Sequence, residues 1–317
     1  MEDRARRYEV MRYVGLAVAV LFAPGSASAF CRTTTVPVAA DFQPGPTRCW
    51  DQGQPLFWRN SCIGYNVQRA ASKQVAYEDA ANGLSQAFTK WTGTSCPTDG
   101  TGRSRVSIDV RDLGPADCTE VKYSSTSPNQ NVIVFRDDVW PHNDTNNTLA
   151  ITTVTFSPAT GEIYDADMEI NTHDQRVTLT DPVPSNGYDF QSIVTHETGH
   201  FLGLAHSGDT RATMFASYTP GETRMRNLTG DDINGICTVY RPDGDRAVLT
   251  GKVTAAPQCD PTPRKGFTTA CAEPVKKGCG GSSSSVAGAS RARSGFAMWL
   301  AAGVGMLFVA RRRRAPR

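Results

Sequence analysis

One eleven-residue stretch, from His196 to His206, constrains what this chain can fold into more than any other feature. It holds three of the five histidines of the protein, and a glutamate follows the first of them. Residues four apart lie on the same face of a helix, so His196 and His200 are spaced to bind one metal ion. Gly203 is expected to end that helix in a left-handed conformation, which turns the chain and brings His206 to the same point.

The residue types of this stretch favour a catalytic zinc ion. Three neutral imidazoles leave the fourth position of a tetrahedral Zn²⁺ for water, which is typical of catalytic zinc. Glu197 is then placed to act as a general base. The spacing is that of the extended zinc-peptidase motif H-E-x-x-H-x-x-G-x-x-H. Ordinary core or surface histidines are the alternative, but five positions fixed together make a chance match about one in ten thousand.

The first 29 residues are typical of a secretory signal. Arginines near the start lead into the apolar run Val14–Phe22, and Ala27-Ser28-Ala29 supplies a small-x-small cleavage pattern. The mature chain is therefore expected to begin at Phe30, with Met11 as an alternative start of translation. A retained transmembrane helix is the other alternative, and the apolar run is short for one.

Cysteine usage fits an exported protein. The chain has nine cysteines, which predicts disulfides in an oxidising compartment. Eight of them precede the tail and leave Cys279 over. The sequence does not fix the pairing, although Cys96 with Cys118 and Cys49 with Cys62 are short-range options.

The formal net charge of +2 places no strong field on the body of the chain. Much of the positive charge lies at the two ends, where four arginines, 311–314, follow the last apolar run. A nucleic-acid partner therefore has no electrostatic support. We expect a monomer whose partner is a protein or peptide substrate.

Composition divides the chain into five parts. The signal peptide (1–29) is followed by an irregular segment rich in Pro, Gly and Thr (30–57) and by the catalytic unit (58–241). A Pro/Gly/Ser-rich linker (242–295) and an apolar tail ending in arginines (296–317) complete the chain. The fifteen apolar residues of the tail are short for a spanning helix, although arginine stems can extend the span.

Periodicity within the catalytic unit predicts both helices and strands. Apolar residues at helical spacing indicate an amphipathic helix over Gln74–Trp91. Asp189 suits the N-cap of the zinc-binding helix, and two aspartates in its first turn favour a closing helix over Leu228–Tyr240. β-rich runs predict strands over Ile63–Val67, Arg105–Val110, Asn131–Phe135, Leu149–Phe156 and within Gly161–Asn171.

These motifs together resemble the metzincin clan of zinc endopeptidases, and within it the matrixin (matrix metalloproteinase-like) branch. Ser207 follows the third histidine, and Met214 lies eight residues after it. The segment 214–218, Met-Phe-Ala-Ser-Tyr, resembles the matrixin turn Met-x-Pro-x-Tyr. The segment 228–236 resembles the closing-helix pattern L-x-x-D-D-I-x-G-I of that branch.

The resemblance implies a fold and a set of roles. The fold would be α+β, a twisted mixed five-stranded sheet with long helices and the zinc in a cleft. Met214 would support the three imidazoles from beneath. Tyr218 would line the specificity pocket, or fill a simple core role. Leu149, Ala150 and Ile151 would lie in the edge strand that pairs with an extended substrate.

The sequence also departs from the matrixin pattern. Ala216 replaces the proline of the methionine turn, which is expected to loosen the pocket wall without touching the zinc. Ile151 and Ile163 stand where matrixins place histidines of a second, structural zinc, so that zinc is expected to be absent.

A calcium ion is a second candidate ligand. Asp165 matches one calcium position of the matrixins, although Met168 replaces the paired glutamate. Asp165, Asp167 and Glu169 alternate along a predicted strand, so that all three can face one side and bind Ca²⁺. A solvated acidic turn is the alternative.

Two cysteines, Cys49 and Cys279, are candidates for roles other than an ordinary disulfide. Matrixin propeptides cap the zinc with a cysteine, and Cys49 in Thr47-Arg48-Cys49-Trp50 is the nearest equivalent, with a disulfide role as the favoured alternative. The tail resembles the tripartite surface-sorting tails of myxobacterial proteins, with Cys279 as the anchoring residue and a processing protease as partner. A plain single-span membrane anchor is the alternative.

The function predicted from the sequence is zinc-dependent hydrolysis of internal peptide bonds in protein substrates. The protein is expected to be exported to the cell surface, either anchored to the membrane or released. A non-catalytic zinc-binding adhesin is one alternative, and Glu197 speaks against it because a scaffold needs no base. A zinc hydrolase of a non-peptide substrate is the other.

Overall fold

The computed structural model describes residues 29–98, 100, 102–143, 148–271 and the backbone of 304–310. Its centre is a mixed sheet in which the body of the chain contributes five strands, in the order β5-β2-β6-β8-β7. The first four are mutually parallel and β7 runs antiparallel to β8. The predicted α+β fold with a mixed five-stranded sheet is therefore confirmed. The strand bounds are β2 (Cys62–Gln68), β5 (Asp109–Ala116), β6 (Val132–Phe135), β7 (Thr148–Phe156) and β8 (Ile163–Ile170).

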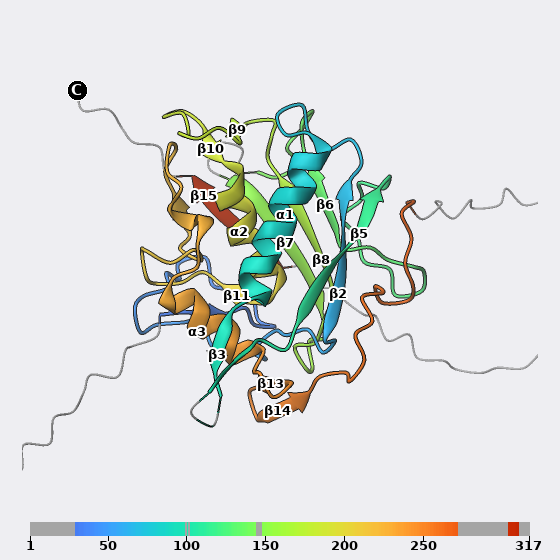
Figure 1. Ribbon diagram of the computed structural model, residues 1–317, viewed down its shortest axis with the longest axis vertical. Coiled ribbons are helices and arrows are strands. Elements are labelled where there is room, and N and C mark those ends of the chain that lie inside the picture. The colour runs from blue at the N-terminus through green and yellow to red at the C-terminus, as the bar shows by residue number, and fades with distance from the viewer. Residues whose placement is uncertain (1–28, 99, 101, 144–147, 272–303, 311–317) are drawn as a thin grey trace, which may run out of the picture.

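Two helices cover one face of this sheet, with α1 in front of α2 in the view of Figure 1. Helix α1 (Tyr77–Thr92) confirms the predicted amphipathic helix, but it begins three residues later than expected because Ala76 is extended. The buried side of α1 packs on the sheet and on α2 (Phe190–Phe201), which carries two of the motif histidines. The core between helices and sheet fixes the position of the metal-binding helix.

Short elements complete the fold. Helix α3 (Gly230–Val239) lies within the predicted closing helix and starts with a capping box between Thr229 and Asp232. The predicted strand over Arg105–Val110 is wrong in its bounds, because Arg105 ends one strand and Asp109 begins another. The remaining elements are β1 (Cys31–Arg32), β3 (Ser95–Pro97), β4 (Arg103–Arg105), β9 (Val177–Thr178), β10 (Tyr188–Asp189), β11 (Leu204–Ala205), β12 (Ser217–Tyr218), η1 (Arg224–Arg226), β13 (Asp245–Val248) and β14 (Gly251–Thr254).

A segment of the C-terminal tail extends the sheet beyond β7. Strand β15 (Val304–Ala310) pairs antiparallel with β7, and on its other side parallel with β12, which makes seven strands in all. The apolar tail was expected to anchor the chain, but the part of it that the structure describes is a strand. β-Branched residues and the unpaired edge of β7 explain this preference. Among the described residues no helix is long and apolar enough to cross a membrane, and 296–303 and 311–317 lie outside them.

Four disulfides tie distant parts of the chain together. Neither of the two short-range pairings considered from the sequence occurs, because folding brings cysteines far apart in the chain closer than their sequence neighbours. Cys49, considered as a zinc cap, is bonded to Cys31. The four pairs are Cys31–Cys49, Cys62–Cys259, Cys96–Cys237 and Cys118–Cys271.

Residues 242–271, expected to belong to a linker, instead pack against the catalytic unit. The side chain of Arg246 is fully buried. It donates hydrogen bonds to the carbonyl oxygens of Trp58 (2.8 Å), Asn60 (3.1 Å) and Ser107 (3.0 Å). The bonds of Arg246, with the Cys62–Cys259 and Cys118–Cys271 disulfides, hold this segment in place, a feature that Pro/Gly/Ser composition does not reveal.

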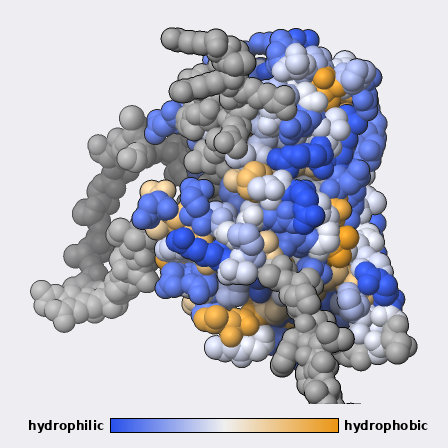
Figure 2. Space-filling view, turned by 90° about the vertical axis from the view of Figure 1, so that its left-hand side faces the viewer, coloured by the Kyte–Doolittle hydropathy of each residue, from blue (hydrophilic) through white to orange (hydrophobic). Residues whose placement is uncertain are grey.

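The surface is largely polar. Figure 2 shows a mostly hydrophilic face on which hydrophobic residues stand in small groups. The large hydrophobic residues that are exposed come from separate segments of the chain: Val36, Val38, Val139, Leu179, Leu249 and Phe267. Scattered apolar residues of this kind are normal on a soluble domain and mark no particular site.

Candidate metal centre and active site

Helix α2 is fixed at its start by a buried carboxylate. Asp189 confirms its predicted N-cap role, because its side chain accepts hydrogen bonds from the amide (2.9 Å) and hydroxyl (2.7 Å) of Ser192. The Arg226 guanidinium holds the same carboxylate at 2.9 Å. In the middle of the helix, the Trp91 indole donates to the carbonyl oxygen of Thr195 at 2.9 Å. These contacts fix the axial position and rotation of α2.

The helix ends as the sequence predicts. Gly203 has a φ of 89°, the left-handed conformation that lets the chain turn. Its amide donates to the carbonyl oxygen of His200 at 2.9 Å. The next two residues form β11, which pairs with β1 of the N-terminal segment. The turn and this pairing deliver His206 to the face that carries His196 and His200.

The three imidazoles meet at one point. One ring nitrogen from each of His196, His200 and His206 lies within 4.8 Å of the other two. The Nδ1 atom of His196 is 2.7 Å from the carbonyl oxygen of Thr213, and that of His200 is 2.8 Å from the carbonyl oxygen of Leu204. A carbonyl oxygen only accepts, so in both rings Nδ1 carries the proton and Nε2 is left with its lone pair.

The charge state of the rings suits a metal ion. Burial lowers the pKa of His200 to about 4 and the pKa values of His196 and His206 well below their ordinary value, so all three are neutral at pH 7. The Nε2 atoms of His200 and His206 are buried without a hydrogen-bond partner among the described residues. Buried lone pairs cost free energy unless something binds them. The donor set therefore fits one Zn²⁺.

Glu197 lies beside this cluster. Its Oε2 accepts a hydrogen bond from the hydroxyl of Thr152 in β7 at 2.6 Å, while Oε1 is buried without a partner among the described residues. Burial raises the pKa of Glu197 to about 8. A divalent cation next to the carboxylate would lower that pKa, because it favours the charged form. With a cation bound, Glu197 can therefore accept a proton near neutral pH.

Met214 packs against α2 at Gly199. A Cβ added at Gly199 would overlap its sulfur atom, so a glycine is needed here for the close approach. The turn is held by Asp232 of α3, whose carboxylate accepts from the amides of Thr213 (2.9 Å) and Met214 (3.0 Å). Asp232 thereby fixes the carbonyl group of Thr213 that orients His196.

The expected substrate-binding residues lie on two strands that flank the centre. Leu149, Ala150 and Ile151 are part of β7, the edge strand of the five-stranded sheet. Tyr218 belongs to β12, which follows the methionine turn, and its buried hydroxyl donates to the carbonyl oxygen of Glu222. The side chain of Tyr218 is fully buried, so any contribution to a pocket comes from the wall that it builds.

Of the three acidic residues of β8, only two contact each other. Asp165, Asp167 and Glu169 are all buried, on the face of the sheet opposite the helices. Asp165 and Asp167 contact each other through their side chains, and burial raises the pKa of Asp165 to about 7 and that of Asp167 above its ordinary value. Glu169 is held elsewhere, at 2.6 Å from Arg136 and 2.9 Å from His142. The expectation of a three-carboxylate calcium site is therefore wrong for Glu169.

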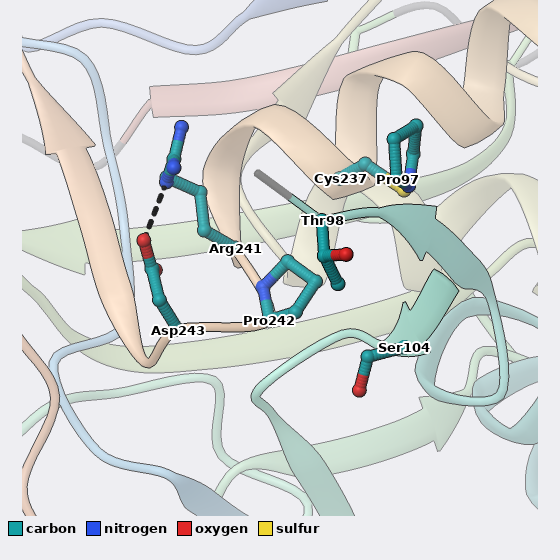
Figure 3. A pocket seen from close by; sticks show the side chains of 7 residues that line it. All are labelled: Pro97, Thr98, Ser104, Cys237, Arg241, Pro242 and Asp243. Atoms are coloured by element: carbon teal, nitrogen blue, oxygen red, sulfur yellow. Dashed lines mark hydrogen bonds and ion pairs between the residues drawn. The ribbon is translucent and has the colours of Figure 1, made fainter. Parts of the chain in front are cut away.

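Other candidate sites among the described residues carry less chemistry. Cys118 and Cys271 group with Glu120, but the two cysteines form a disulfide and cannot bind a metal as thiolates. Figure 3 shows a surface pocket of about 290 Å³ between the β3–β4 hairpin and the end of α3. Its charged groups, Arg241 and Asp243, pair with each other at 3.0 Å. No residue of the histidine cluster lines this pocket.

Sequence reasoning missed two residues of the site. Thr152 has no motif of its own, and only the position of β7 beside α2 brings its hydroxyl to Glu197. Asp232 was seen as a favourable charge in a helix start, whereas it also binds the methionine turn. A signal for it exists, since Thr229 and Asp232 have the spacing of a capping box.

Comparison with known proteins agrees with this geometry. The model of the matrixin family, peptidase M10, matches residues 57–241. Metalloendoproteinase 1 from Glycine max is 33% identical over 158 residues, which cover 50% of this chain and 44% of the relative. Human matrilysin is 38% identical over 103 residues (32% and 35%), and human neutrophil collagenase is 41% identical over 78 residues (25% and 16%). The chain thus spans less than half the length of these relatives.

Proposed function

Because the chain belongs to the matrixin family, we propose that it is a zinc-dependent endopeptidase that hydrolyses internal peptide bonds of protein substrates. The proposal rests on the convergence of three neutral imidazoles, two of them oriented by carbonyl groups, beside a buried glutamate. His196, His200 and His206 would hold the ion. When bound there, zinc supplies Lewis acidity and lowers the pKa of a water molecule toward neutrality.

The residues of the chain would share the remaining work. Glu197 accepts a proton from water and passes it to the leaving amine, with Thr152 holding one carboxylate oxygen in place. The backbone of Leu149–Ile151 aligns an extended peptide along the edge of β7. Tyr218 supports the wall of the specificity pocket from β12. Met214 packs under the helix and keeps the ligands in register.

Glu197→Gln tests this mechanism. The variant keeps the shape of the side chain but cannot accept a proton, so hydrolysis of casein is expected to fall about 10²- to 10⁴-fold while one zinc per chain is retained. Thr160→Ala, a change in an exposed turn, is the matched control and should leave hydrolysis unchanged. Hydrolysis by Glu197→Gln at the wild-type rate would overturn the mechanism.

We also propose that the protein is exported and acts as a monomer outside the cytoplasm. Four disulfides support an oxidising compartment. Residues 1–29 would be the signal peptide, and Cys279 in the tail the residue at which a sorting protease anchors the chain at the surface. Residues 1–28 and Cys279 lie outside the described residues. Mass spectrometry of the mature protein tests this, because an intact Arg317 would exclude processing.

Calcium remains a proposal in a narrower form. We infer that Asp165 and Asp167 share one Ca²⁺, because the Oδ1 atom of Asp165 is buried without a partner among the described residues and both carboxyls resist ionisation alone. Millimolar Ca²⁺ should then raise the melting temperature of the wild type. It should leave Asp165→Asn unchanged, and an equal rise in both proteins would overturn the assignment.

A further inference from the structure

The edge of β7 is occupied by the protein's own tail. Strand β15 runs antiparallel to β7, with Met306 opposite Thr152 and Leu307 opposite Ile151. The ladder is interrupted after Leu307 and resumes with Val309 opposite Thr148. On the other side, β15 pairs parallel with β12, with Val309 opposite Ser217. Figure 1 shows β15 beside β7, on the side of the sheet near α2.

These two neighbours of β15 are the two strands that flank the metal centre. Thr152 of β7 binds Glu197 through its hydroxyl, and Met306 is its partner across the ladder. Strand β12 begins three residues after Met214, in the segment that supports the histidine ligands. The tail backbone over 306–309 therefore passes at the level of the proposed general base.

With β15 in place most of the centre is covered, and only His206 of the three ligands is half-buried rather than buried. The side chains of His196, Glu197 and His200 are fully buried. An endopeptidase must admit an extended peptide and water to this point, and the peptide needs the same backbone groups of β7 that β15 already uses. Each amide and carbonyl group at a strand edge can serve one partner strand. Occupation by the tail and by a substrate are therefore mutually exclusive.

We propose that residues 304–310 act as an internal inhibitor that adds to the edge of β7 and closes the cleft until the tail is removed or withdrawn. This inference rests on the proposed peptidase function. Any cut between Cys271 and Val304 would separate the strand from the domain. Insertion of the apolar tail into a membrane would also withdraw the strand from β7. Anchoring or processing of the tail would then also switch the enzyme on.

The tether is long enough to allow both states. Thirty-two residues, 272–303, join the disulfide-bonded Cys271 to β15. A tether of thirty-two residues gives the strand an effective concentration of about 1 mM. If the free strand binds with a dissociation constant of about 0.1 mM, the tail inhibits the full chain about ten-fold.

The test uses the full chain with point substitutions. Leu307→Pro removes a backbone donor within β15 and should release the strand. Ala289→Pro, in the Gly/Ser-rich segment outside β15, is the matched control. Two properties are measured for each zinc-loaded protein: amide hydrogen exchange of residues 148–154, and kcat/KM for a short peptide substrate.

We expect faster exchange in β7 and an approximately ten-fold higher kcat/KM for Leu307→Pro, with the control equal to the wild type. A synthetic peptide of residues 302–312 should then inhibit Leu307→Pro competitively. Unchanged exchange in β7 would overturn the docking, and faster exchange without a gain in activity would overturn the inhibition. Faster exchange with no hydrolysis by any of the three proteins would overturn the proposed peptidase function instead, since the docking is read independently of activity.

Discussion

In two regions of this molecule, potential metal ligands lie four residues apart in the sequence. Only in one of them do the ligands converge on a single point. His196 and His200 lie on helix α2, where four residues advance about 6 Å and return to the same face. Asp165 and Glu169 lie on strand β8, where four residues advance about 13 Å. Both pairs face one side of their element, but a single ion can bridge only the first.

The surroundings reinforce this difference. The carbonyl groups of Thr213 and Leu204 orient two of the imidazoles and leave their Nε2 atoms for a metal. In β8, by contrast, Arg136 and His142 already contact the Glu169 side chain, and only the two aspartates remain in contact with each other. Ligand spacing thus predicts a site only together with the rise of the element that carries it.

When one potential ligand is substituted in each region, the largest expected effect is on the zinc content of the protein. His200→Ala removes one of three donors, which should weaken zinc binding more than about 100-fold, beyond the loss typical of outer hydrogen-bond partners. Asp165→Asn should leave zinc at one ion per chain. Elemental analysis after dialysis against a weak chelator measures both. Equal zinc loss in the two variants would contradict the claim that only the histidine region binds zinc.

A smaller loss of zinc affinity is expected when Asp232, which does not bind the metal but holds the methionine turn, is substituted. Asp232→Ala frees the amides of Thr213 and Met214, so the carbonyl that orients His196 loses its fixed position. We expect zinc affinity to fall about 10- to 100-fold. Asp243→Ala, a half-exposed aspartate after α3, serves as control. A zinc competition titration decides, and identical affinities for both variants would show that the turn needs no such support.

In the acidic region, the Arg136–Glu169 pair is the sensitive point. Arg136→Met removes the arginine charge and leaves the buried Glu169 carboxylate with the His142 ring as its remaining side-chain partner among the described residues. The free energy of unfolding should fall by about 3 kcal/mol, as for other broken buried pairs. Lys73→Met breaks an exposed pair with Asp138 and should cost less than about 0.5 kcal/mol. Urea unfolding of both variants provides the comparison, and similar small losses would mean that Glu169 is not dependent on Arg136.

A further effect concerns pH. Burial raises the pKa of Asp165 to about 7, above its unfolded value near 4. Between these pH values the unfolded chain has released the proton that the folded chain keeps, so stability decreases as pH rises through this window. Asp165→Asn, which cannot titrate, should flatten that slope when measured without calcium. A wild-type slope that persists in the variant would assign the titration to another group.

The three histidine ligands could be predicted from the sequence because their arrangement is local. Helical rise, an N-cap at Asp189 and the left-handed Gly203 suffice to place three ligands. The long amphipathic helix and most strands followed from periodicity for the same reason. The exception is the run Arg105–Val110, which the structure divides between β4 and β5.

Features that depend on distant segments could not be predicted in this way. The disulfide Cys62–Cys259 spans 197 residues, and no local rule selects it. Arg246 looks like a surface residue of a linker, but its burial depends on carbonyl groups near residues 58 and 107. The strand conformation of 304–310 likewise depends on the free edge of β7, whereas composition alone suggested a membrane segment.

Three imidazole nitrogens, from His196, His200 and His206, are expected to bind one zinc ion. Zinc K-edge X-ray absorption on the full chain measures the ligands directly. We predict one zinc per chain with three imidazole nitrogen neighbours at about 2.0–2.1 Å. In His206→Ala, the number of imidazole neighbours should fall by one. A chain that retains no zinc, or zinc whose ligand shell is unchanged in His206→Ala, would contradict the account.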